Sequence, residues 1–119
     1  MRDLIKTFKA LSDESRLRTL SLLLERECCV CEVMQALDIS QSKASRILSA
    51  LYGGGILKLR KDGRWSLYSI DREGMGEHLV YVVEAVAKAL EDNPAAALDR
   101  ERLKKAERVG PGCVRQMAS

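Results

Sequence analysis

Apolar residues recur every three or four positions in two segments near the N-terminus, as they do on the buried face of a helix. The first stripe runs from Leu4 to Leu11 and the second from Leu17 to Leu24. The dipeptide Ser12-Asp13 separates them, and side chains of this kind cap helix N-termini. We therefore predict two scaffold helices. We expect Arg16 and Arg18 on the second to be solvated, the alternative being an approach to DNA phosphate.

A second pair of helices follows, joined by a very short turn. Residues 30–37 form a short apolar segment, and the turn Asp38-Ile39-Ser40 ends in a good N-cap. The buried stripe of the next segment is formed by Ala44, Ile47, Leu48 and Leu51. Two helices with so short a connection predict a helix-turn-helix, in which the helix that begins after Ser40 reads DNA.

The opposite face of this reading helix carries small hydroxyls and positive charge. The residues that we expect to contact DNA from it are Ser40, Gln41, Ser42, Lys43, Ser45 and Arg46. Arginine can bind a guanine edge through two hydrogen bonds, and serine or lysine can contact phosphates and bases. The alternative interpretation is an ordinary solvated helix face.

After three glycines, which cannot sustain a helix, the hydrophobic period changes to two. Residues 57–60 alternate between leucine and a basic residue, and Asp62-Gly63 is a strong hairpin signal before a returning strand, Trp65 to Ile70. Lys61 and Arg64 at the tip are expected to contact the DNA backbone or minor groove, as a wing does. The predicted fold class is α+β, mainly α: a winged helix-turn-helix with the order α-α-α-α-β-β-α.

The helix predicted from Asp71 to Leu90 is apolar nearly all the way round, and its last twelve residues contain only two charges, Glu84 and Lys88. One face can pack on its own domain, whereas the other needs a cover, for which a second copy is the economical choice. We expect a homodimer through the N- and C-terminal helices, with Val83 and Val86 in the seam. Such a dimer presents two reading helices to the half-sites of a palindromic operator.

The chain divides into two parts by composition. We assign residues 1–92 to a DNA-binding and dimerisation domain, which ends before Asn93-Pro94, and residues 93–119 to a charged helix with a flexible tail. Residues 99–108 are charged at eight of ten positions. We therefore expect an exposed helix there, followed by disorder around Cys113.

Composition narrows the class of protein. The 119 residues carry a net charge of +3, with 46% hydrophobic and 31% charged residues, which is typical of a globular domain and only mildly favourable to an anionic partner. No apolar run long enough to span a membrane occurs, and the N-terminus lacks a signal-peptide core, so we expect a cytoplasmic protein with no membrane partner. No constellation of catalytic residues stands out, so we expect neither enzymatic activity nor a required cofactor.

Three thiols, Cys28, Cys29 and Cys31, lie within four residues at the start of the helix of residues 30–37. A helix N-terminus lowers the pKa of a thiol and favours the thiolate that binds soft ions. A second CxxC is absent and the single histidine, His78, is distant, which disfavours a structural zinc site. A thiol oxidoreductase that uses Cys28 and Cys31 is an alternative, although the chain lacks the βαβ pattern of such enzymes.

Four segments carry a family resemblance: LSDESRLRTLSLL from Leu11, ECCVCEV from Glu27, SQSKASRILSAL from Ser40 and DGRWSLYSI from Asp62. Over roughly residues 3–91 the chain resembles the ArsR/SmtB family of metal-sensing winged-helix repressors. ECCVCEV is similar to that family's arsenic box, ELCVCDLC, whose cysteines bind trivalent arsenic or antimony.

The resemblance assigns the first two ligands to Cys29 and Cys31. Its third ligand falls on Met34, whose neutral thioether is a poor substitute for a thiolate. The third thiol is then Cys28, which replaces the family's leucine, or Cys113 from the tail. We favour Cys28 because it is local and costs no loop closure.

The resemblance implies a dimeric repressor that binds a palindromic double-stranded DNA operator and is released when thiolates bind As(III) or Sb(III). The alternative effectors are cadmium, lead and zinc, which prefer four ligands and could use all four cysteines.

Residues i and i+2 of a helix point to nearly opposite sides. We therefore expect that ligation by Cys29 and Cys31 unwinds or re-aims the start of their helix and so disturbs the reading helix.

Overall fold

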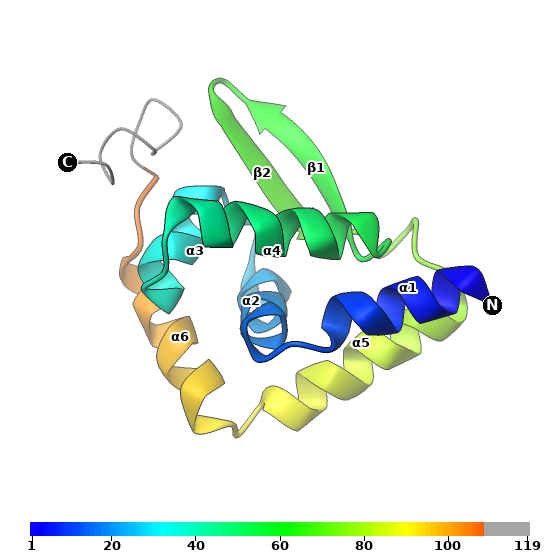
Figure 1. The fold of residues 1–119 in the computed structure, drawn as a ribbon. Coiled ribbons are helices and arrows are strands. Elements are labelled where there is room, and N and C mark those ends of the chain that lie inside the picture. The colour runs from blue at the N-terminus through cyan, green and yellow to red at the C-terminus, as the bar shows by residue number, and fades with distance from the viewer. Residues whose placement is uncertain (109–119) are drawn as a thin grey trace.

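The computed structural model describes residues 1–108 and contains six helices and one two-stranded antiparallel hairpin in that range (Figure 1). The elements are α1 (Arg2–Leu11), α2 (Glu14–Glu25), α3 (Val30–Leu37), α4 (Gln41–Gly53), β1 (Leu57–Asp62), β2 (Trp65–Ile70), α5 (Glu77–Leu90) and α6 (Pro94–Lys105). The predicted winged helix-turn-helix of α+β class is therefore confirmed, with α3 and α4 as the helix pair and β1–β2 as the wing.

The core forms around α2, which lies in the middle of the molecule with α4 on one side and α5 on the other (Figure 1). Leu20 and Leu22 of this helix are completely buried, and they belong to one cluster with Leu48, Leu51 and Ile56. These apolar side chains come from α2, from α4 and from the turn between α4 and β1. Their burial supplies the main driving force for folding, at about 25 cal/mol per Å² of apolar surface.

The helix boundaries follow from local chemistry. The carboxylate of Asp13 accepts a hydrogen bond from the Arg16 N–H at 3.1 Å, and the hydroxyl of Ser40 accepts one from the Lys43 N–H at 3.2 Å, so each residue caps the helix that it precedes. Asp38 ends α3 with a left-handed backbone, φ 56°. A Cβ on Gly54 would lie 2.7 Å from the Cβ of Ala10, so this glycine allows α1 to pack closely on α4.

The helix α5 begins at Glu77, six residues later than predicted. The intervening residues form a turn in which the Asp71 carboxylate accepts the Gly74 N–H at 3.0 Å and the Asp71 carbonyl accepts the Met75 N–H at 3.0 Å. Within α5, Val83 is 2% exposed and packs in the core of its own chain, so its expected place in a dimer seam is wrong.

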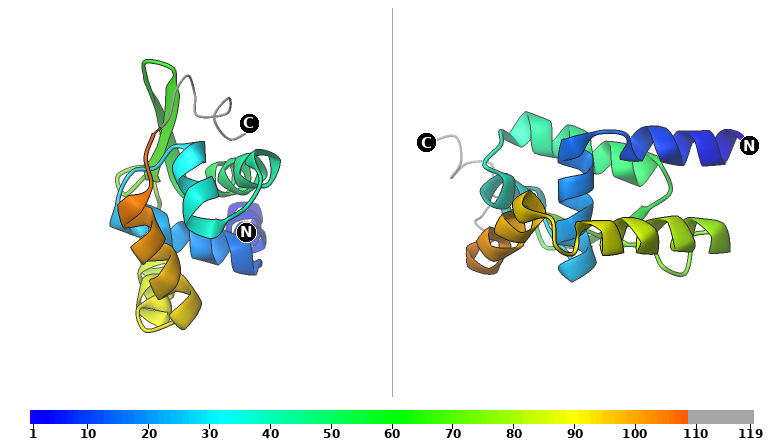
Figure 2. Two further views of the ribbon diagram at one scale, coloured as in Figure 1. Left: turned by 90° about the vertical axis from the view of Figure 1, so that its left-hand side faces the viewer. Right: turned by 90° about the horizontal axis from the view of Figure 1, so that it is seen from below.

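One end of the molecule exposes apolar side chains. Helices α1 and α5 both project from that end (Figure 2), and Ile5 and Phe8 of α1 and Tyr81 of α5 are 47%, 50% and 61% exposed. None of the helices within residues 1–108 is long and apolar enough to cross a membrane.

The helix α6 packs on α2 and α3 at the other end of the molecule, so the prediction of an exposed charged helix is wrong (Figure 2). Ala96, Asp99 and Leu103 are almost completely buried. The guanidinium of Arg18 donates two hydrogen bonds to the Asp99 carboxylate, at 2.7 and 2.8 Å. Arg18 was expected to be solvated, but it holds α6 against α2.

Candidate metal centre and nucleic-acid interface

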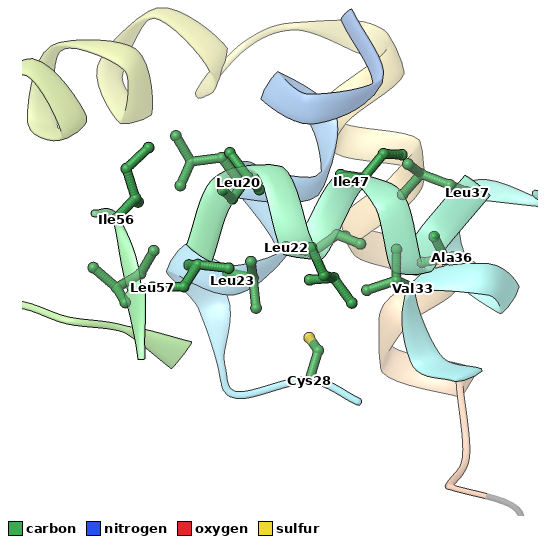
Figure 3. Close-up of a cluster of buried hydrophobic side chains, with 14 of the residues drawn as sticks. Leu20, Leu22, Leu23, Cys28, Val33, Ala36, Leu37, Ile47, Ile56 and Leu57 are labelled. Atoms are coloured by element: carbon green, nitrogen blue, oxygen red, sulfur yellow. The ribbon is translucent and has the colours of Figure 1, made fainter. Parts of the chain in front are cut away.

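The thiol segment is attached to the wing by a short β-bridge. The Cys28 N–H donates to the Tyr68 carbonyl at 3.0 Å, and the Tyr68 N–H donates to the Cys28 carbonyl at 2.8 Å. Successive side chains of an extended segment point to opposite sides. Cys28 accordingly lies in the main core, with its sulfur directed toward Leu22 (Figure 3), whereas Cys29 lies in a separate cluster.

Cys29 is the N-cap of α3 and has an extended backbone, with φ −95° and ψ 172°. Its sulfur lies 2.8 Å from the sulfur of Cys31. Cys29 therefore lies just outside the helix, and its sulfur and that of Cys31 lie side by side while the first turn of α3 is intact. The premise that the two side chains point to opposite sides of one helical turn is wrong, because it treated Cys29 as part of the helix.

Apolar neighbours surround this thiol pair. Cys29 and Cys31 are 1% and 0% exposed, and they cluster with Leu67 and Trp65 of β2. Burial raises the pKa of the Cys29 thiol above its usual value and outweighs the lowering by the hydrogen bond from the Glu32 N–H. Burial also raises the pKa of Cys28, to about 12. At Cys28 and Cys29, burial thus raises the thiol pKa by more than the helix N-terminus was expected to lower it.

A buried carboxylate lies beside the thiols. Glu32, 3% exposed, accepts a hydrogen bond from the Cys29 N–H at 2.9 Å, which completes a capping box at the start of α3. Its oxygens also accept bonds from Arg26 at 2.5 Å and Arg108 at 3.0 Å. Burial alone would raise the pKa of Glu32, but these three donors hold that pKa below its usual value. Sequence reasoning missed Glu32, although its spacing of three from an N-cap is a capping-box signal.

The segment after α6 runs along α3. The side-chain amide of Gln35 donates to the Glu107 carbonyl at 2.7 Å, and the Glu107 N–H donates to the Gln35 side chain at 3.1 Å. The Cys31 sulfur lies 3.7 Å from the same carbonyl. Cys113 is outside the described residues, five positions after Arg108. Within residues 1–108, no three potential ligands are gathered closely enough to hold a metal ion, and Cys28 is not brought to the thiol pair.

The reading face of α4 has the predicted arrangement. Ala44, Ile47, Leu48 and Leu51 are buried. The exposed residues are Ser40, Ser42, Lys43 and Arg46, while Gln41 and Ser45 are half-buried and joined by a hydrogen bond of 3.0 Å. The helix therefore presents its hydroxyl and basic groups on one surface.

The wing carries less free positive charge than its sequence indicates. Lys61 and Arg64 are exposed at the tip, and Lys61 donates to the Ser66 hydroxyl at 2.6 Å. Arg60 instead donates two hydrogen bonds of 2.8 Å to the carboxylate of Glu27, which neutralises it. The ion pair also fixes the wing to the residue just before the thiol segment.

Comparisons with known proteins agree with this architecture. A family model described as "Bacterial regulatory protein, arsR family" matches residues 13–58, which run from the N-cap of α2 into β1. The "Arsenic resistance transcriptional regulator ArsR1" of Pseudomonas putida is 39% identical over 101 residues, which are 84% of this chain and 75% of the relative. The "Cadmium resistance transcriptional regulatory protein CadC homolog" of Staphylococcus aureus is 42% identical over 83 residues, which are 69% of this chain and 65% of the relative.

A solved structure is similar over most of its length. It is the homodimeric winged helix-turn-helix DNA-binding domain of a possible ArsR-family transcriptional regulator from Mycobacterium bovis, with a TM-score of 0.64 and 27% identity over 78% of this chain and 82% of that one. The chain described here therefore belongs to the ArsR family of bacterial regulatory proteins, and it is a DNA-binding winged helix-turn-helix transcriptional regulator, not an enzyme.

Proposed function

We propose that this protein is a dimeric repressor that binds a palindromic operator and is released when As(III) or Sb(III) is bound by cysteine thiolates. The observation that carries the proposal is the pair of sulfurs, Cys29 and Cys31, 2.8 Å apart at the start of the helix that packs on α4. Soft thiolate sulfur is the ligand that such thiophilic ions prefer. The similarity to regulators of arsenic and cadmium resistance is consistent with it.

The third ligand in this proposal is Cys113. Cys28 is disfavoured because its side chain lies in the main core, on the opposite side of the extended segment from Cys29. Bringing it to the pair would break the bridge to Tyr68 and expose apolar surface. Cys113 follows a segment that already contacts Cys31 and Gln35, so only a short stretch of chain has to close.

The coupling to DNA runs through two adjoining contacts. The sulfur of Cys29 is engaged by the Glu32 N–H as part of the helix cap, and a sulfur drawn toward a shared ligand site gives up that bond. Loss of an N-cap destabilises a helix by about 1 kcal/mol. Val33 and Leu37 of α3 lie in the same core cluster as Ile47 of α4 (Figure 3). A shift of α3 therefore changes the position of α4, and a coupling of about 3 kcal/mol would weaken operator binding roughly a hundredfold.

The DNA contacts in this proposal are made by the exposed residues of α4 and by the wing. Arg46, Lys43 and the serines of α4 enter the major groove, and Lys61 and Arg64 contact the flanking backbone. The exposed apolar side chains of α1 and α5 form the dimer interface, and the homodimeric relative from Mycobacterium bovis supports this assembly. The two-fold axis then relates two copies of α4.

A second candidate effector is a divalent ion such as cadmium, lead or zinc, favoured by the similarity to the cadmium-resistance regulator. Such ions prefer four ligands. A four-thiol site would need Cys28, which the main core holds away from the pair, so the three-thiol site is the better supported one.

The test is a titration of operator-bound protein with As(III), Sb(III), Cd(II) and Zn(II). We expect release by As(III) and Sb(III) at concentrations at which Cd(II) and Zn(II) have little effect. Cys113→Ser should lose this response and Cys28→Ala should keep it. Release from a Cys113→Ser protein, together with no release from Cys28→Ala, would reverse the assignment of the third ligand.

A further inference from the structure

We infer that Glu27 competes with DNA phosphate for Arg60 and thereby weakens the hold of the wing on DNA. The inference goes one step beyond the proposed function and rests on it, because it takes the wing as a contact to the DNA backbone. It concerns the charge that the wing presents, and it does not depend on which ion the thiols bind.

Arg60 stands on the face of the wing that covers the thiol cluster. It lies opposite Leu67 in the β1–β2 register, and residues directly opposite one another share one face of a sheet. Leu67 belongs to the cluster of Cys29 and Cys31. From this face the guanidinium reaches Glu27, and its Nε and Nη2 each donate to one oxygen of the carboxylate at 2.8 Å.

The ion pair has good geometry but remains in contact with water. The side chain of Arg60 is 58% exposed, and that of Glu27 is 26% exposed. An exposed ion pair contributes little to stability, because water and salt screen it and both side chains lose rotational freedom. Another anionic acceptor can therefore take Arg60 at little cost. A DNA phosphate is such an acceptor, since a guanidinium binds phosphate and carboxylate through the same two parallel N–H donors.

A phosphate comes within reach of Arg60 when the tip of the wing contacts DNA. Arg60 directly precedes Lys61, a proposed backbone contact, and neighbouring Cα atoms are about 3.8 Å apart. Phosphates of one strand recur about every 3.4 Å along the helix axis. While Arg60 stays with Glu27, this contact is not made. Glu27 therefore lowers the affinity for DNA of any sequence, because phosphate contacts carry no base information.

The wing does not depend on this ion pair for its position. Two backbone hydrogen bonds between Cys28 and Tyr68, at 3.0 and 2.8 Å, attach it to the thiol segment, and Leu67 is completely buried. Replacing Glu27 by Gln therefore changes the charge beside Arg60 and leaves the fold of the wing in place. The variant can thus separate an electrostatic role of Glu27 from a structural one.

The test measures binding of the full chain to a DNA duplex of arbitrary sequence at several salt concentrations. We expect Glu27→Gln to bind more tightly than the wild type. With one added phosphate contact per wing and two wings per dimer, the slope of log affinity against log salt should steepen by about two. The gain over the wild type should consequently be about tenfold larger at about 50 mM than at about 200 mM salt.

Two further backgrounds separate the transfer of Arg60 from the plain loss of a negative charge. In an Arg60→Gln protein, Glu27→Gln should leave the salt slope unchanged, because no guanidinium remains to be transferred. In a Lys58→Gln protein, which lacks another exposed basic residue of the same strand, Glu27→Gln should still steepen the slope by about two. Equal changes of slope in the two backgrounds would overturn the inference.

The tip residues show whether the inference or the proposed function is at fault. If Lys61→Ala and Arg64→Ala weaken binding while Glu27→Gln keeps the affinity and salt slope of the wild type, the competition is overturned and the wing contact stands. If none of the three substitutions changes binding, the wing does not contact DNA and both fail. Weaker binding by Glu27→Gln would show that the ion pair positions the wing, and it would also overturn the inference.

Discussion

Cys29 caps α3, and in the proposed function it also supplies a ligand to the bound ion. Its sulfur accepts a hydrogen bond as the N-cap of α3, and the same sulfur lies next to that of Cys31. A serine can fill the first role, because its hydroxyl is a good N-cap, but it cannot supply a thiolate. The two roles can therefore be separated by one substitution.

We expect Cys29→Ser to fold and bind operator DNA as the wild type does, while As(III) no longer releases it. Cys29→Ala should also lose the response, and it should in addition lower the free energy of unfolding by about 1 kcal/mol through the lost cap. Denaturant unfolding and operator binding with and without As(III) measure both effects. Full release of the Cys29→Ser, Cys31→Ser double variant would rule out thiol sensing.

At the scale of single elements, α4 and the wing should contribute differently to DNA binding. Arg46→Ala should weaken operator binding by about 1–3 kcal/mol and relax the preference at one base pair, because a guanine contact carries sequence information. Lys61→Ala and Arg64→Ala should weaken binding to all sequences and reduce the slope of affinity against salt, since phosphate contacts carry none. Equal losses on operator and unrelated DNA for Arg46→Ala would move the reading surface elsewhere.

The helix α6 should depend strongly on one ion pair. Arg18→Ala leaves the Asp99 carboxylate buried without its partner, and we expect the free energy of unfolding to fall by about 3 kcal/mol. The double variant Arg18→Leu, Asp99→Leu should recover much of that loss, because two apolar side chains do not leave a buried charge. A double variant less stable than Arg18→Ala would contradict this account, as measured by urea unfolding.

The elements differ in how well periodicity predicts them. The stripes of α4 and the Asp62-Gly63 hairpin are local patterns, and both were predicted correctly. The packing of α6 was not, because Asp99 reads as a solvated charge until its partner, 81 residues earlier, is known. The close approach of the Cys29 and Cys31 sulfurs was not predicted. The direction of the Cys29 side chain depends on whether this residue is the N-cap or the first helical residue, and a sequence pattern does not locate a helix end to within one residue.

At the scale of the whole molecule, the thiol site and the exposed apolar end lie far apart. Helices α3 and α6 lie at one end, and α1 and α5 project from the other (Figures 1 and 2). Cys29 and Cys31 lie at the start of α3. Ion binding by the thiols is therefore not expected to alter DNA binding through direct contact with the dimer interface. It is expected to act through α3, which packs on α4.

The dimer can be tested without disturbing the core. Phe8→Glu places a charge on an exposed apolar side chain of α1, and we expect a monomer that is folded but binds operator weakly. Val83→Glu is not a suitable probe, since Val83 belongs to the core of its own chain. Sedimentation should show the loss of the dimer, and Glu84→Ala, at an exposed charged position on α5, is the control that should remain dimeric. A wild type that sediments as a monomer at micromolar concentration would contradict the proposed assembly.

Trp65 is the single tryptophan of the chain, and it packs on the cluster that contains Cys29, Cys31 and Leu67. Indole emission responds to heavy atoms and polar groups in contact with the ring, so the protein carries its own optical reporter within the thiol site. Intrinsic fluorescence should change as As(III) is added, with no label and no DNA present, and the change should be absent in the Cys29→Ser, Cys31→Ser protein. Trp65 fluorescence would follow ion binding, and a dye on the DNA would follow release of the operator in the same sample. Comparison of the two signals would show whether binding and release have the same time course.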